Sequence, residues 1–201
     1  MKEVRKGMLI VISGPSGTGK GTLCNRLLHN DTSLRFSVSV TTRARREGEI
    51  DGVHYHFISE QKYDELLKQD CFLEHATVHG HRYGTLEAPV DEGIEKGHNI
   101  LLDIDPQGAI SVMDKRPDCV SIFILPPSYE ALRVRLHTRN TDDPEEIKRR
   151  LNNARGEVEK LSRYQYAVVN DDLQMAYEKL SHIISAEKQR TNRYFPAIED
   201  F

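Results

Sequence analysis

Four glycines around a lysine give residues 14–22, GPSGTGKGT, the clearest potential for chemistry in the sequence. Glycines at this spacing let main-chain N–H groups converge on an anion, and a lysine neutralises phosphate oxygens. The segment follows an apolar run and precedes a helical pattern, so the helix dipole also favours an anion there. We predict a nucleotide-phosphate site made of Gly14, Pro15, Ser16, Gly17, Thr18, Gly19, Lys20, Gly21 and Thr22.

One position departs from the usual G-x-x-x-x-G-K-[ST] pattern, because Gly21 stands where a magnesium-directed hydroxyl is expected and Thr22 follows one place late. Magnesium keeps several waters and uses substrate phosphates as ligands, so one missing protein ligand is tolerable. We therefore expect Mg²⁺ to be held through ATP phosphates and water, with no metal site built by the protein itself. The ending GKGT resembles that of nucleoside monophosphate kinases of the adenylate kinase type, which implies that Thr22 binds phosphate. Whether Thr22 also contacts the metal stays open.

Alternating strands and helices are predicted to position this loop. Apolar runs at 8–12, 99–105, 119–125 and 166–170 are typical of strands buried on both faces of a parallel sheet, and a helical pattern follows each. From about residue 35 to 90, FSVSVTT and VHYHFIS instead alternate apolar and polar residues, which indicates strands with one solvated face. The sequence therefore predicts an α/β fold with an inserted lobe that has its own small sheet.

Two later helices carry arginines beside their apolar faces. For the second helix, Asp143 is the predicted N-cap and Pro144 lies in the first turn. Its apolar stripe is Ile147, Leu151, Ala154, Val158 and Leu161. At about 100° per residue, Arg150 lies on the flank of this stripe and Arg149 points nearly opposite. In the first helix, Arg135 and Arg139 follow the edge of the stripe formed by Leu132 and Leu136, so they could line a cleft.

Composition excludes several classes of protein. A formal net charge of −3 gives no reason to expect binding to nucleic acid or membranes. Cys24, Cys71 and Cys119 are far apart in sequence, which predicts reduced thiols rather than disulfides or a zinc site. No run of about 18 apolar residues occurs, so we expect a cytoplasmic protein. The histidines between 54 and 81 are interpreted as free side chains at turns.

Several motifs resemble those of guanylate kinases in order and spacing: FSVSVTTRARREGEIDGVHY, FLEHATVHGHRYGT, LLDIDPQG, IFILPPS and VVNDDL. The chain is identified as a member of that family over residues 7–187. The resemblance implies a P-loop NTPase-type parallel sheet flanked by helices, with a core (7–34, 91–136 and 151–187), a GMP-binding insert (35–90), a helical lid (137–150) and a C-terminal extension (188–201). It also implies phosphoryl transfer from ATP to GMP with Mg²⁺, giving ADP and GDP in purine nucleotide metabolism. Nothing identified would distinguish the 2′-OH, so dGMP is expected as a second acceptor.

The same resemblance assigns roles to individual residues. The acceptor phosphate would be bound by Arg43, Arg46, Tyr55 and Tyr83, and the guanine by Ser39, Glu74, Thr85 and Asp105. Glu74 is the expected discriminator, because guanine offers a carboxylate two donors on one edge and adenine offers no such pair. Asp103 would act through magnesium and water, and Asn170 would lie beside the adenosine. Transfer itself would depend on Lys20, Arg43, Arg135, Arg139, Arg150 and Asp103.

Three departures from the family pattern, Arg45, Pro106 and Asn140, put rate and lid motion in question rather than the reaction. Two alternatives stay open: a scaffold domain that holds phosphopeptides in the GMP lobe, and a kinase with another acceptor such as IMP. A GTPase is disfavoured because no N-K-x-D motif occurs. Oligomeric state is left undecided between monomer and homo-oligomer.

Overall fold

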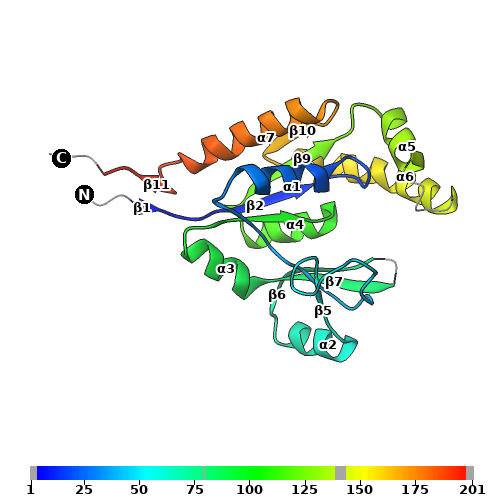
Figure 1. Ribbon diagram of the computed structural model, residues 1–201, viewed down its shortest axis with the longest axis horizontal. Helices are drawn as coiled ribbons and strands as arrows, with labels where there is room; N and C mark the ends of the chain where they lie inside the picture. Colours follow the sequence, from blue (N-terminus) through cyan, green and yellow to red (C-terminus); the bar gives the residue numbers. More distant parts are fainter. Residues whose placement is uncertain (1–3, 79, 139–143, 198–201) are drawn as a thin grey trace.

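A five-stranded parallel sheet forms the centre of the computed structural model, which describes residues 4–78, 80–138 and 144–197 (Figure 1). Its strand order is β10-β9-β2-β8-β3, and every neighbouring pair is parallel. The strands are β2 (Leu9–Ser13), β3 (Leu34–Phe36), β8 (Asn99–Asp103), β9 (Val120–Leu125) and β10 (Tyr166–Val169). The four strands predicted from apolar runs are confirmed, and β2 is buried along its whole length.

Helices cover both faces of this sheet, as predicted. The helices are α1 (Lys20–Asn30), α3 (Glu87–Glu95), α4 (Pro106–Lys115) and α7 (Leu173–Lys188). Side chains of Ile10 and Ile12 pack with α1 and α7 on one face. Those of Leu9 and Val11 pack with α3 and α4 on the other. Because successive side chains of a strand point to opposite faces, the continuous apolar run of β2 supplies both cores.

A second sheet of four strands, in the order β5-β4-β7-β6, forms a separate layer with helix α2 at the lower edge of Figure 1. Its elements are β4 (Val40–Thr41), β5 (His56–Phe57), α2 (Glu60–Lys68), β6 (Phe72–Val78) and β7 (His81–Leu86). Val40, Tyr63 and Phe72 form its small core. This sheet confirms a small sheet within the expected insert.

Two details of the insert differ from the prediction. Residues 35 and 36 belong to β3, which pairs with β8 in the main sheet, so this part of the expected insert lies in the core. The alternating runs also give strands of only two residues, at 40–41 and 56–57. Between them the chain turns, with positive φ at Gly48 and Gly52. The alternation overestimated strand length, and both residues of β4 are buried, so the expected solvated face is absent from that strand.

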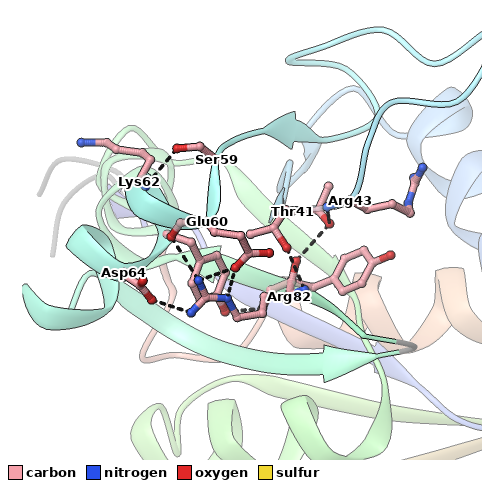
Figure 2. A network of polar contacts seen from close by, with 10 residues as sticks. Thr41, Arg43, Ser59, Glu60, Lys62, Asp64 and Arg82 are labelled. Atoms are coloured by element: carbon pink, nitrogen blue, oxygen red, sulfur yellow. Dashed lines mark hydrogen bonds and ion pairs between the residues drawn. The ribbon is translucent and has the colours of Figure 1, made fainter.

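Arg82 of β7 links helix α2 to the second sheet through hydrogen bonds and a stacking contact (Figure 2). Its guanidinium donates to Glu60 and, at 2.6 Å, to Asp64 on α2, and it stacks over the ring of Tyr63. The hydroxyl of Tyr63 in turn donates to the main-chain oxygen of Tyr83 at 2.8 Å. The main chain at Tyr83 is therefore held by Tyr63 and follows directly after the anchored Arg82.

Helices α5 (Tyr129–Thr138) and α6 (Pro144–Val158) pack together at the right of Figure 1. Leu132 and Leu136 contact Ile147, Leu151 and Ala154, which confirms the predicted apolar faces. The stripe ends sooner than expected, since Val158 is the last residue of α6 and a 3-10 helix, η1, occupies Glu159–Arg163. The predictions for Arg139, Asn140 and Asp143 fall outside the described residues.

The described part of the chain after α7 packs on the core. Strand β11 (Tyr194–Phe195) pairs antiparallel with β1 (Val4–Arg5). The buried side chain of Arg193 forms an ion pair with buried Glu187 and donates to the main-chain oxygen of Asp118 at 2.7 Å. The last described turn of chain is thus part of the folded unit.

All three cysteines are free; Cys24 and Cys119 are buried and Cys71 is half-buried. Within the described ranges, no group of three or more His, Cys, Asp or Glu side chains could hold a metal ion. In the same ranges, none of the helices has the length and apolar character needed to cross a membrane.

Candidate active site

The glycine loop joins β2 to α1, as predicted, at the carboxyl edge of the main sheet. Gly14, Gly17 and Gly19 all have positive φ, a conformation that other residues rarely adopt. At Gly14 a Cβ would lie 2.2 Å from the main-chain oxygen of Ile124, so only glycine fits between the neighbouring strands. The side chain of Thr18 bonds back to the oxygen of Pro15 at 2.9 Å and holds the turn closed. The main-chain N–H of Thr18 donates to the same oxygen at 3.4 Å, so both donors of Thr18 are used within the loop.

Lys20 is folded over this loop. Its Nζ donates to the main-chain oxygens of Gly14 at 2.6 Å and Pro15 at 3.1 Å. Burial lowers the pKa of Lys20, and the negative charge of Asp103 opposes that shift. Burial likewise raises the pKa of Asp103, with Lys20 opposing. The lysine and the carboxylate at the end of β8 are thus an electrostatic pair held out of bulk solvent.

A cavity of about 340 Å³ lies beside Lys20. Its walls come from the loop, from the end of β8 and from α6, and include Ser16, Asp103, Asp105, Arg150 and Glu157. Arg150 donates to Glu146 at 3.1 Å and to Ser16 at 3.3 Å, so α6 touches the loop directly. The predicted position of Arg150 on the flank of its helix is confirmed.

Gly21, which stands where the usual motif has a hydroxyl residue, lies beside the carboxylate of Asp103. A Cβ on Gly21 would lie 3.8 Å from Oδ2 of Asp103, so glycine leaves open space beside that carboxylate. Thr22 lies elsewhere, in a cavity of about 430 Å³ that it shares with Gly19, Arg135 and Asn170. Thr22 and Asp103 therefore line different cavities.

Asn170 connects three parts of the site. Its side-chain amide donates to the oxygen of Thr18 at 2.7 Å, and its own main-chain oxygen accepts from Arg135 at 2.9 Å. The Nη1 nitrogen of Arg135 is buried and has no hydrogen-bond partner among the described residues. A buried guanidinium nitrogen without a partner is costly unless a ligand completes it.

A third cavity, of about 280 Å³, lies between the two sheets. It brings together five residues predicted to contact the acceptor nucleotide, namely Ser39, Tyr55, Glu74, Tyr83 and Asp105. Ala76, Asp103 and Ile104 complete its wall. Asp103, Ile104 and Asp105 also line the cavity beside Lys20. The two cavities therefore adjoin along residues 103–105.

Glu74 is fixed within this cavity wall. It is 6% exposed, and its Oε1 accepts from the hydroxyl of Thr85 at 2.7 Å. Burial raises the pKa of Glu74, the Thr85 hydroxyl lowers it, and the charge of Asp105 raises it further. Asp105 itself caps α4, with Oδ1 accepting from the main-chain N–H groups of Gln107 and Gly108. Thr85 thus orients the glutamate instead of lining the cavity.

Of the predicted phosphate-binding residues, Tyr55 and Tyr83 line this cavity, whereas Arg43 and Arg46 do not. Arg43 is 8% exposed and stacks near the rings of Tyr55, at 5.6 Å, and Phe57. The rings of Tyr55 and Tyr83 contact edge to face at 5.8 Å. Arg46 is exposed, and its main-chain N–H donates to Glu49 at 2.7 Å.

Sequence reasoning missed several residues of the site. Arg149, expected to face solvent, is exposed yet lines the cavity beside Lys20, together with Asn153 and Glu157. Glu49 forms an ion pair with Arg43, and Gly108 contacts Glu74. None of these carries a sequence signal of its own, because each matters only through a neighbour brought close by the fold.

The main sheet and the glycine loop define the class of P-loop nucleotide-binding proteins, in which main-chain N–H groups hold the phosphates of a nucleoside triphosphate. The family model for guanylate kinase matches residues 6–187. Guanylate kinase of Neisseria meningitidis is 48% identical over 200 residues, covering 100% of this chain and 98% of the relative. That of Caldanaerobacter subterraneus subsp. tengcongensis is 48% identical, covering 96% and 94%.

A crystal structure of guanylate kinase from Anaplasma phagocytophilum superposes with a TM-score of 0.77 and 36% identity, covering 94% of this chain and 90% of that one. The chain belongs to the guanylate kinase family. It is an enzyme that transfers a phosphoryl group from ATP to GMP, as predicted from the motifs.

Proposed function

We propose that the three cavities divide the reaction between them. The cavity of about 280 Å³ takes GMP, the one beside Asn170 takes the adenosine of ATP, and the one beside Lys20 takes the transferred phosphoryl group. The observation that carries this proposal is the shared wall at residues 103–105, which joins the acceptor cavity to the lysine. A GMP phosphate placed across this wall would face the end of the triphosphate.

Guanine is read chiefly by Glu74. Its carboxylate accepts from the N1–H and the exocyclic amine of guanine, while Thr85 keeps the carboxylate in place. Ser39 and Asp105 complete the polar wall around the base. No residue assigned to the acceptor reads the 2′-OH, so dGMP is a second acceptor.

The acceptor phosphate is bound by Arg43 and Arg46, with Tyr55 and Tyr83 as neutral donors. An arginine fork donates paired hydrogen bonds to a dianionic phosphate, which suits this task better than a lysine would. The phosphate oxygen then attacks the γ-phosphorus of ATP, the bond to the β–γ bridging oxygen breaks, and ADP leaves. No protein base is needed, because the attacking oxygen is already anionic.

Lys20, Arg135 and Arg150 stabilise negative charge during transfer, and we assign Arg139 the same role from the family pattern. Their contribution is positioning and electrostatics. The open space that Gly21 leaves beside the carboxylate of Asp103 fits Mg²⁺, which prefers oxygen ligands and retains water. When bound, the ion neutralises part of the triphosphate charge. Asp103 would hold it through water, and Thr22 would contact phosphate from the adenosine side.

Two parts of the molecule, a GMP lobe and a lid, would move around the site of phosphoryl transfer. The insert at 35–90, with the four-stranded sheet and α2, would be the GMP lobe, and residues 137–150 would be the lid. Their closure would exclude water and limit ATP hydrolysis. The reaction would serve purine nucleotide metabolism in the cytoplasm, where thiols such as Cys24 stay reduced.

A coupled assay of ADP release, run against a panel of nucleoside monophosphates with ATP and magnesium, tests these assignments. We expect turnover with GMP and dGMP, weaker turnover with IMP, which lacks the exocyclic amine, and very little with AMP. Glu74→Ala should lose GMP turnover yet still bind ATP, whereas Glu65→Ala, an exposed carboxylate on α2, should behave as the parent. Unchanged GMP turnover in the Glu74 variant would remove that residue from its role.

A further inference from the structure

Glu49, in the loop between β4 and β5, contacts two of the residues assigned to the acceptor phosphate. Its Oε1 accepts from Nη2 of Arg43 at 2.7 Å, and its Oε2 accepts from Nη1 at 3.1 Å. Oε2 also accepts from the main-chain N–H of Arg46 at 2.7 Å. One carboxylate thus joins the side chain of the first arginine to the main chain of the second.

The bonds that Glu49 makes leave one edge of the Arg43 guanidinium for another ligand. A guanidinium has five N–H groups, two on each terminal nitrogen and one on Nε. Nη1 donates to Glu49 and to the oxygen of Ala44 at 2.8 Å, and Nη2 donates once to Glu49. The Nε–H and the second Nη2–H form the remaining edge, which has the parallel geometry that two phosphate oxygens require. The pKa of Arg43 is raised chiefly by its bond to Glu49 and in part by Tyr83, which lines the acceptor cavity.

Arg43 is also fixed at its main chain. Its N–H donates to the hydroxyl of Thr41 at 3.2 Å, and Thr41 donates to the oxygen of Arg82 (Figure 2). In the same view the Arg43 side chain extends away from the cluster of Arg82, Glu60 and Asp64. The acidic residues of α2 therefore hold Arg82, and Glu49 alone of the described carboxylates forms an ion pair with Arg43.

We propose that Glu49 is a positioning residue for the acceptor phosphate, orienting the open edge of Arg43 and fixing the loop that carries Arg46. The inference rests on the proposed assignment of both arginines to the GMP phosphate. In this role Glu49 keeps its bonds when GMP binds. The phosphate adds to the arginine instead of replacing the carboxylate.

An opposite role, in which Glu49 imitates the phosphate and must be displaced, is disfavoured by burial and bonding. The Glu49 side chain is only 17% exposed, and leaving it without its cation would be costly. Its bond to the Arg46 N–H is independent of the guanidinium and would hold it in place. Hydrogen bonds from Arg43 and Arg46 lower the pKa of Glu49 to about 2, so the carboxylate is charged at any assay pH. The two roles predict opposite changes in GMP affinity.

Steady-state kinetics of Glu49→Ala and Glu49→Gln test the proposal, with Glu47→Ala as the matched control, since Glu47 is an exposed carboxylate of the same loop. We expect Glu49→Ala to raise KM for GMP by about tenfold or more, while kcat at saturating GMP and KM for ATP change by less than about twofold. Glu49→Gln, which keeps one acceptor oxygen, should lie between. Glu47→Ala should match the parent.

Two further measurements separate positioning from a general loss of structure. Guanosine, which has no phosphate, should inhibit the parent and Glu49→Ala equally. In a double-mutant cycle with Arg43→Met, the two changes should be less than additive, because Glu49 acts through Arg43. An unchanged or lowered KM for GMP in Glu49→Ala, or an equal loss of guanosine binding, overturns the inference. If Arg43→Met itself leaves KM for GMP unchanged, the proposed phosphate site is wrong, and the inference fails with it.

Discussion

Gly108, the third residue of α4, is expected to be a hidden determinant of acceptor binding. It is buried, and a Cβ placed on it would lie 2.7 Å from Oε2 and 3.3 Å from Cδ of Glu74. The Gly108→Ala substitution therefore forces the carboxylate to move. Glu74 has little freedom to do so, since its other oxygen is bonded to Thr85 at 2.7 Å.

The size of the effect follows from opposing contributions. Overpacking of a buried site costs about 1–3 kcal/mol, whereas alanine is favoured over glycine inside a helix by about 1 kcal/mol. The net change in unfolding free energy should then be small, about 0–2 kcal/mol destabilising. Displacing a carboxylate from its hydrogen bonds with guanine should cost about 1.5–3 kcal/mol, which raises KM for GMP roughly 10- to 100-fold.

Steady-state kinetics and thermal unfolding of Gly108→Ala test whether KM for GMP rises while stability changes little. Gly156→Ala is the matched control, because Gly156 is also helical and a Cβ placed on it would have nothing within 4 Å. It should keep the parent KM for GMP and be slightly more stable. KM for ATP should stay the same in both variants. A folded Gly108→Ala protein with the parent KM for GMP would refute the reasoning that this glycine makes room for Glu74.

Three further outcomes follow from the site and the core. Because burial raises the pKa of Glu74, KM for GMP should rise as the pH falls through that raised value, and Glu74→Gln should lose this dependence in kinetic pH profiles. Arg193→Ala leaves buried Glu187 without its cation and should lower the unfolding free energy by about 3–5 kcal/mol in urea denaturation, against less than about 1 kcal/mol for exposed Arg190→Ala. Burial tends to raise the pKa of Glu187, but its bonds to Tyr166 and Arg193 outweigh this and lower it, so the cost of Arg193→Ala should shrink as the pH falls through that lowered value. Arg135→Met should reduce kcat about a hundredfold or more while KM for GMP holds, measured at saturating ATP.

The main sheet and the glycine loop were predictable from the sequence because their causes are local. A strand buried on both faces is apolar throughout, as β2 is, and the loop needs glycines at positions that only glycine can adopt. The residues lining the acceptor cavity were predictable only as a set, through the order of motifs along the chain. Singly, Glu74 is one acidic residue among many.

Features that depend on long-range pairing were not predictable. Strands β1 and β11 have two residues each, too few to show an alternation, and they lie at opposite ends of the described chain. Strand β3 joins the main sheet through β8, which the sequence between them does not reveal. Glu49 and Gly108 likewise act through partners that local patterns cannot specify.

Pairing of β1 with β11 places both described ends of the chain on one corner, at the left of Figure 1, while helices α5 and α6 lie at the right. Val4 is the direct neighbour of Phe195. A short glycine–serine linker could therefore close the backbone into a ring, and new ends could be opened at a surface turn.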